Sequence, residues 1–104
     1  MIRHCVFLRF RADVSADEKA GIYAGLEALV GRIDGLLSFM AGPNVSPEGK
    51  SRGYDDGFIM DLRDRAALER YLDDADHKAA SARLVAALEG GPDGLIVFDL
   101  EVPA

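Results

Sequence analysis

The chain has 104 residues, of which 49% are hydrophobic and 29% are charged, and its formal net charge is −6. This length accommodates one hydrophobic core, so we expect a single domain over residues 1–104. The 12 Lys and Arg residues form no run, which disfavours binding to nucleic acid or to an acidic membrane surface. No segment is apolar over a length that would span a bilayer.

Cysteine usage indicates the compartment. Cys5 is the single cysteine, so it forms no disulfide within the chain and no CxxC pair for metal binding or redox chemistry. Arg3, Arg9 and Arg11 interrupt the apolar N-terminus, which argues against a secretory signal peptide. We therefore expect an intracellular, cytoplasmic protein.

The N-terminal third predicts a strand followed by a helix. Over residues 2–11, IRHCVFLRFR, apolar residues alternate with others, as is typical of a β-strand. Ser15 and Glu18 then have the spacing of a capping box, which marks a helix start. We expect this helix to end near residues 31–35, after an apolar stripe formed by Ile22, Leu26, Leu29, Val30 and Ile33.

The middle of the chain predicts two further strands. Residues 36–42 are short, apolar and bounded by turns, which favours a second strand. Residues 43–53 have loop composition, with two Pro, two Gly and two Ser. Residues 56–64 alternate again and predict the third strand.

The C-terminal part predicts a helix in two pieces and a last strand. Asp64 can cap a helix over residues 65–73, RAALERYLD. Residues 77–90, HKAASARLVAALEG, predict the second piece, because Ala80, Leu84 and Leu88 recur one turn apart. Residues 94–102, GLIVFDLEV, predict the last strand.

Three carboxylates, Asp73, Asp74 and Asp76, lie directly before His77. Aspartate is a favoured N-cap and suits the positive start of a helix, so we expect Asp74 or Asp76 to begin the second piece. This restart aims His77 inward. Hard cations need converging oxygens, whereas carboxylates this close at a helix start point away from one another, so we expect no metal site.

The order β-α-β-β-α-β predicts an α+β, ferredoxin-like fold, with a four-stranded antiparallel sheet and helices on one face. The other face would expose an apolar patch that monomers rarely tolerate, so we expect a homodimer with its sheets packed face to face. The expected interface residues are Cys5, Phe7, Arg9, Ile59 and Val97. Residues of the same parities could supply charge pairs there: Arg3, Arg9, Asp61 and Asp99.

Five segments occur in a characteristic order along the chain: IRHCVFLRFR with His4, LLSFMAGPNVSPEG with Gly42, Asn44 and Ser46, the pair Gly53-Tyr54, YLDDADH with Tyr71 and His77, and IVFDLEV. This ordered set resembles the stress-responsive dimeric α/β-barrel (Dabb) family over essentially the whole chain. The resemblance implies two ferredoxin-like protomers whose sheets pack into a barrel. Most family members have no assigned reaction; some are plant stress proteins that form larger oligomers, and others are polyketide-cyclase-like enzymes.

In the cyclase-like members, a Tyr/His pair acts in a pocket between sheet and helices, and the resemblance places this pair on Tyr71 and His77. The strand-one histidine of the family falls on His4. The position of its strand-three histidine holds Asp56. With these residues, we expect the pocket to be lined by Val6, Leu8, Asp56 and Phe58.

The chemistry of the pair follows from ordinary pKa values. A histidine, with a pKa of about 6.5, can take a proton from a carbon acid near neutral pH, whereas a tyrosine, with a pKa of about 10, suits hydrogen-bond donation to an enolate. On this hypothesis His77 is the base, Tyr71 stabilises the oxyanion and His4 supports them. The alternative for His4 is a core histidine satisfied by one hydrogen bond.

Three functions remain open from the sequence. The first is a homodimeric Dabb protein that binds a small apolar or carbonyl compound, with no assigned activity. The second is a cyclase or isomerase that uses Tyr71 and His77, with no cofactor, since the chain has no Walker loop, GxGxxG motif or nucleophile elbow. The third is a structural role in oligomers, with side chains filling the pocket, whereas a ligand site would need roughly 300 Å³ or more.

Overall fold

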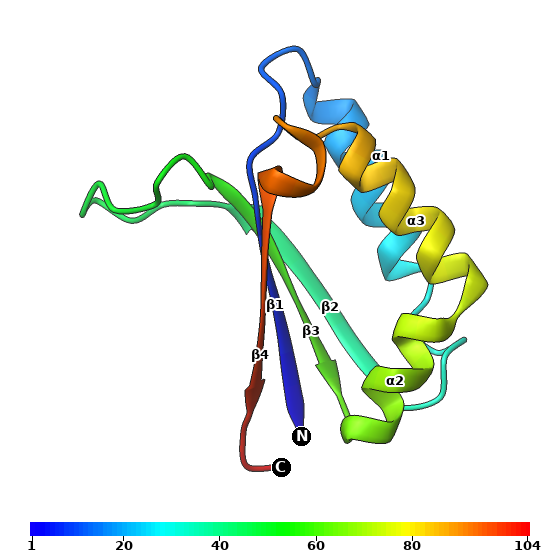
Figure 1. The fold of residues 1–104 in the computed structure, drawn as a ribbon. Coiled ribbons are helices and arrows are strands. Elements are labelled where there is room, and N and C mark those ends of the chain that lie inside the picture. Colours follow the sequence, from blue (N-terminus) through cyan, green and yellow to red (C-terminus); the bar gives the residue numbers. More distant parts are fainter.

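The computed structural model describes residues 1–104 and shows one antiparallel sheet with helices packed on one of its faces (Figure 1). The sheet has four strands in the order β2-β3-β1-β4, so β1 lies in the interior and β4 at an edge. The strands are β1 Ile2–Leu8, β2 Leu36–Pro43, β3 Asp56–Leu62 and β4 Leu95–Glu101. This architecture confirms the predicted ferredoxin-like fold.

Three α-helices cover the sheet on one side (Figure 1). They are α1 Ala16–Glu27, α2 Arg65–Asp73 and α3 Ala75–Ala86, and a short 3₁₀ turn, Gly91–Gly94, leads into β4. Between β2 and β3, the chain projects away from the sheet as an arm, residues 44–55, which is irregular as its composition predicts. No helix is long and apolar enough to cross a lipid bilayer.

Helix α1 ends earlier than its apolar stripe predicts. It stops at Glu27, and the chain then continues in tight turns in which the amides of Leu29 and Val30 bond to carbonyls three residues back. Leu29 and Ile33 are nevertheless buried in the core. The stripe therefore predicts which residues are buried, although the regular helix ends at Glu27 and the chain continues in turns to Gly31, whose φ is positive.

The caps of the other two helices follow the prediction. The Asp64 carboxylate accepts from the amide of Ala67 at 2.9 Å and begins α2. The Asp74 carboxylate accepts from the amides of Asp76 and His77 at 2.9 and 3.0 Å, so Asp74 is the N-cap of α3. Helix α3 therefore starts two residues before the expected position, at Ala75.

The core lies between the helices and the covered face of the sheet. Its sheet side is formed by alternate residues of the two interior strands, and its helix side by one residue or more from each helix. The main contributors are Ile2, Val6, Leu8, Phe58, Met60, Leu62, Ile22, Leu26, Tyr71 and Leu84.

The register of β4 corrects one prediction. Val97 lies opposite Val6 and Asp99 opposite His4, so both point to the helix side rather than to the open face where we expected them. Ile96, Phe98 and Leu100 occupy the open face instead. Because β4 is apolar on both parities, periodicity does not fix which face is covered, and only the pairing with β1 decides it.

Removal of the α3 cap is expected to cost stability. Asp74→Ala should lower the free energy of unfolding by about 1 kcal/mol, because two amides at the helix start lose their acceptor. Asp73→Ala is the matched control, since Asp73 is exposed at the end of α2, and we expect a change below about 0.5 kcal/mol. Urea unfolding measures both, and equal losses would contradict the capping role.

Candidate functional site

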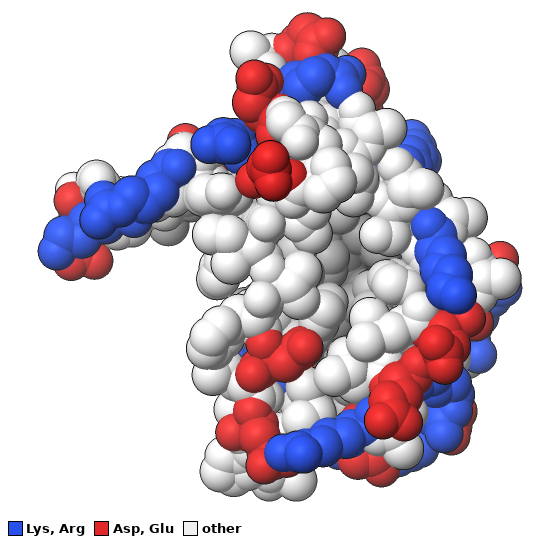
Figure 2. Space-filling model, in the orientation of Figure 1, with Lys and Arg blue, Asp and Glu red and all other residues white.

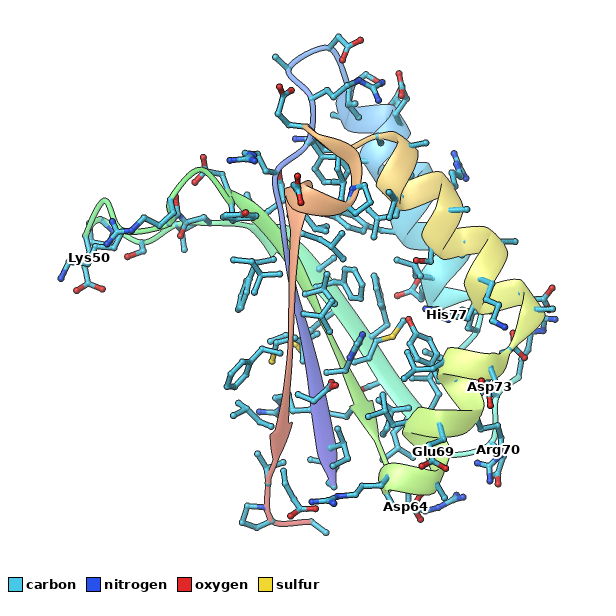
Figure 3. The ribbon with its side chains drawn as sticks, in the orientation of Figure 1. Lys50, Asp64, Glu69, Arg70, Asp73 and His77 are labelled. Atoms are coloured by element: carbon cyan, nitrogen blue, oxygen red, sulfur yellow. The ribbon has the colours of Figure 1, made fainter.

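A cavity of about 150 Å³ lies between the sheet and helices α2 and α3. It contains the three residues that the sequence singles out, His4, Tyr71 and His77, together with the expected Val6 and Phe58. The remaining lining residues are Leu26, Leu72, Ser81, Leu84, Leu95 and Val97. In Figure 3, His77 lies at the junction of α2 and α3, on the side facing the sheet.

Two predicted lining residues lie elsewhere. Leu8 is fully buried in the core and does not reach the cavity. Asp56, at the start of β3, forms an ion pair with Lys19 of α1 at 3.1 Å. The position of the family's strand-three histidine is therefore used here for a contact between the sheet and α1.

His4 and Asp99 form the central polar contact of the site. They face each other on the paired strands β1 and β4, and His4 Nδ1 lies 2.6 Å from Asp99 Oδ1. Because a carboxylate only accepts, the proton of this bond belongs to Nδ1, which leaves Nε2 as the nitrogen available to a ligand. An imidazole oriented in this way by a carboxylate is the arrangement of a general base.

Tyr71 brings a hydroxyl group into an apolar environment. The residue is 1% exposed, and its ring meets that of His4 edge-on, with 5.6 Å between centroids. Burial raises the pKa of Tyr71 well above its ordinary value of 10, and the negative charge of Asp99 raises it further. The phenol therefore stays protonated and can donate a hydrogen bond to an oxygen atom in the cavity.

His77 is held against Tyr71. Their ring centroids are 3.9 Å apart, and His77 Nδ1 is buried without a hydrogen-bond partner. Burial lowers the pKa of His77 below its ordinary value of 6.5, and nearby His4 lowers it further. His77 is therefore uncharged at neutral pH.

Strand periodicity predicts the open face for Asp99, whereas the residue lies on the helix side and is bonded to His4, a contact that the sequence did not reveal. The signal in the sequence is the first of two carboxylates, Asp99 and Glu101, in the otherwise apolar run LIVFDLEV. The three aspartates before His77 do not converge, since Asp74 caps α3, Asp76 pairs with Arg32 and Asp73 is exposed. No group of three His, Cys, Asp or Glu residues is arranged to hold a metal ion.

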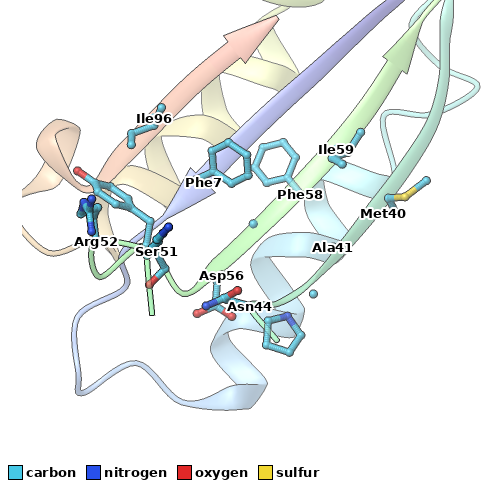
Figure 4. A pocket seen from close by; sticks show the side chains of 15 residues that line it. Phe7, Met40, Ala41, Asn44, Ser51, Arg52, Asp56, Phe58, Ile59 and Ile96 are labelled. Atoms are coloured by element: carbon cyan, nitrogen blue, oxygen red, sulfur yellow. The ribbon is translucent and has the colours of Figure 1, made fainter. Parts of the chain in front are cut away.

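The open face of the sheet carries a second, larger hollow, of about 660 Å³, at the base of the arm (Figure 4). Its floor is apolar and includes Phe7, Ile59 and Ile96, and its outer wall includes Lys50 and Arg52 of the arm. None of His4, Tyr71 and His77 reaches it. It belongs to the face on which we expect a second protomer.

Two charged residues of the open face are already paired within the chain. Arg3 and Asp61 form a two-pronged ion pair at 2.9 and 3.2 Å, and the Arg9 guanidinium lies over the Tyr54 ring at 5.2 Å. The Cys5 thiol is buried beside them, and burial raises its pKa. The Arg3 and Asp61 charges therefore neutralise each other on this face.

Several known proteins are similar to this chain in fold and in sequence. Residues 2–102 match the Stress responsive A/B Barrel Domain family (Dabb). A dimeric ferredoxin-like protein of unknown function from Jannaschia sp. CCS1 is 37% identical, with 97% of this chain and 98% of that chain covered and a TM-score of 0.89. No curated protein matches the chain.

Two further solved structures are similar. A Dabb family protein from Mesorhizobium loti MAFF303099 is 28% identical, with a TM-score of 0.74 over 99% of this chain and 96% of that one. The hydroxynitrile lyase of Passiflora edulis is 16% identical, with a TM-score of 0.85 over 98% of this chain and 93% of that one. At that identity, the likeness shows the fold alone.

The lowered pKa of His77 predicts a change of stability with pH. In the unfolded chain His77 titrates near 6.5, and in the folded chain it titrates lower. Between these two values the unfolded chain binds more protons, so the free energy of unfolding falls as the pH drops through 6.5. His77→Phe, which keeps a ring against Tyr71, should therefore lose less stability than the wild type between pH 8 and pH 5.

Urea unfolding at the two pH values measures this difference. Ser81→Ala is the matched control, because Ser81 lines the same cavity but does not titrate. It should follow the wild-type pH dependence. An equal loss of stability in wild type and His77→Phe would show that His77 does not titrate differently on folding.

Proposed function

The chain belongs to the stress-responsive A/B barrel (Dabb) family, and on that premise we propose that it binds a small carbonyl or hydroxyl compound and moves a proton on it without a cofactor. The observation that carries this proposal is the 2.6 Å contact between His4 and Asp99 at an apolar cavity that also contains the Tyr71 hydroxyl. A buried histidine that is oriented by a carboxylate and lies next to a protonated phenol can act in general acid–base catalysis.

In this proposal His4 is the base. Nε2 takes a proton from a carbon next to the carbonyl, or from a hydroxyl group, and Asp99 stabilises the imidazolium that forms. The electron pair of the broken bond stays on the ligand, and Tyr71 donates a hydrogen bond to the oxygen that becomes negative. The proton returns from Nε2 to the product, so the site is regenerated.

His4 suits this role better than His77. His77 Nδ1 has no partner, so no carboxylate is hydrogen-bonded to that ring, and burial opposes a positive charge on it. The close contact of His77 with Tyr71 instead supports a positioning role, in which a neutral ring holds the phenol toward the ligand.

The size of the cavity limits the ligand. A volume of about 150 Å³ is below the roughly 300 Å³ that we expected of a ligand site, a value that applies to drug-sized ligands, but it is near that of an apolar protein cavity that admits benzene. This favours a compound of six to ten heavy atoms over a polyketide chain, which disfavours the polyketide-cyclase alternative.

Proton transfer can be tested without knowledge of the substrate. Small ketones and aldehydes are incubated with the protein in D₂O, and deuterium uptake at the carbon next to the carbonyl is followed by NMR. His4→Phe should lower the exchange rate by roughly 10²–10⁴-fold, and Tyr71→Phe by roughly 10²–10³-fold. Asp73→Asn, on the surface outside the cavity, should keep the wild-type rate. Exchange that is no faster in wild type than in His4→Phe would exclude a base at His4.

We also propose that the protein is a homodimer that buries the open face of the sheet. Phe7, Ile96 and Phe98 on this face are 43–56% exposed, although they are large and apolar. Such an exposed apolar surface is typical of a protein–protein interface. The similar protein from Jannaschia sp. is described as dimeric, which supports the same assembly. The free thiol of Cys5 suits the reducing cytoplasm, where we place the protein.

A charge on the open face should disrupt this dimer. Phe98 is 56% exposed, and Phe98→Glu is expected to give monomers, because a carboxylate buried between two sheets would lose its hydration. Leu72→Glu is the matched control, since Leu72 is 46% exposed but lies on α2, on the helix side. Light scattering coupled to size-exclusion chromatography should find Leu72→Glu dimeric. A monomeric wild type, or a dimeric Phe98→Glu, would show that this face is not the interface.

A further inference from the structure

We infer that the cavity at His4 accepts uncharged ligands and rejects carboxylates of the same size and shape. This inference rests on the proposed function, because it concerns the ligand of the same site. It follows from the charges around the cavity. The Asp99 carboxylate is bonded to the lining residue His4, and no Lys or Arg lies in the lining.

The lining residues offer no positive charge to an anion. None of the eleven is Lys or Arg, and the ionisable ones are His4, Tyr71 and His77. Tyr71 stays protonated and His77 stays neutral, for the reasons given above. An anionic ligand would therefore meet no Lys or Arg side chain in the lining, and it would lie next to the His4–Asp99 pair.

That pair has no net positive charge as long as Asp99 is a carboxylate. With a neutral imidazole the pair carries the charge of Asp99, −1, and with a protonated imidazole its net charge is 0. The charge of Asp99 is also felt inside the cavity, since it contributes to the raised pKa of Tyr71.

The charged groups around the site do not reverse this balance. Glu69 and Asp73 lie one turn apart on α2, next to the junction that holds His77 (Figure 3). Arg65, on the same helix, is paired with Glu101 of β4. Lys78 of α3 is exposed to solvent, and the effect of its charge on the pKa of His77 is opposed by that of Asp74. Figure 2 shows the hollowed white surface between sheet and helices, bordered by acidic side chains as well as basic ones.

A carboxylate that enters the cavity therefore loses hydration and gains no counter-charge, whereas an amide, ketone, alcohol or nitrile of the same size loses much less. Asp99 is 34% exposed, so water screens part of its charge. We expect the neutral ligand to bind about tenfold more tightly than the carboxylate. Two charges without water between them would give a larger difference. The favoured substrate class is then small uncharged carbonyl or hydroxyl compounds, in preference to carboxylates and phosphate esters.

Benzamide and benzoate are suitable probes, because they have nearly the same shape and differ by one charge. Each is titrated at pH 8 into the full-length protein, and binding is followed by the NMR signals of Ser81 and His77, which line the cavity. We expect benzamide to bind about tenfold more tightly than benzoate. Asp99→Asn removes the charge at constant volume and should bring the two affinities close together.

Glu48→Gln is the matched control, because it removes one carboxylate on the exposed arm, away from the cavity. It should keep the wild-type preference. Equal binding of the two probes to the wild type would overturn this inference and leave the proposed function intact. If neither probe shifts the cavity signals, the proposed function fails and this inference fails with it. The wild-type comparison requires no variant, so poor folding of Asp99→Asn would not obscure the result.

Discussion

The structure depends on one constraint: three short helices cover only part of one face of a four-stranded sheet. The interior strands β1 and β3 are buried on the helix side, but β4 at the edge is largely uncovered, and Val97 is 51% exposed although it points toward the helices. This incomplete cover leaves the cavity at the boundary between the core and β4. Because all three helices lie on one side, the opposite face has no cover within the chain, and this is the face on which we propose a second protomer.

The break between α2 and α3 creates the contact on which the site is built. In a continuous helix, residues six apart are separated by about 9 Å along the axis and point in different directions. Tyr71 and His77 are six apart, yet their ring centroids lie 3.9 Å from each other. Asp74 makes this possible, because its extended backbone ends one helix while its carboxylate begins the next. Asp74, whose local role is that of an ordinary helix cap, therefore sets the geometry of the cavity.

Local patterns in the sequence predict most of the fold, because strand alternation and helix caps depend on neighbouring residues. In this way the sequence identified Asp64 as one helix cap, and either Asp74 or Asp76 as the other. The register of β4 could not, since a strand that is apolar on both parities has no preferred face until its partner is known. The error on Asp99 came from this step, and with it the central hydrogen bond of the site was missed. Cavity volume also depends on how side chains of distant elements pack, which no local pattern contains.

The edge position of β4 also explains how a charged group can serve a buried base. A carboxylate fully inside an apolar cavity would be costly, whereas Asp99 is 34% exposed and remains partly hydrated. Its partner His4 is buried on the neighbouring strand, so the hydrogen bond joins the solvent-exposed edge of the sheet to the apolar cavity. The group that must carry charge thus sits at the boundary, and the neutral groups, Tyr71 and His77, sit inside. On the other side of His4, β3 places the fully buried Met60, so a carboxylate at that position would have no such access to water, and β4 is the neighbouring strand that can supply this pairing.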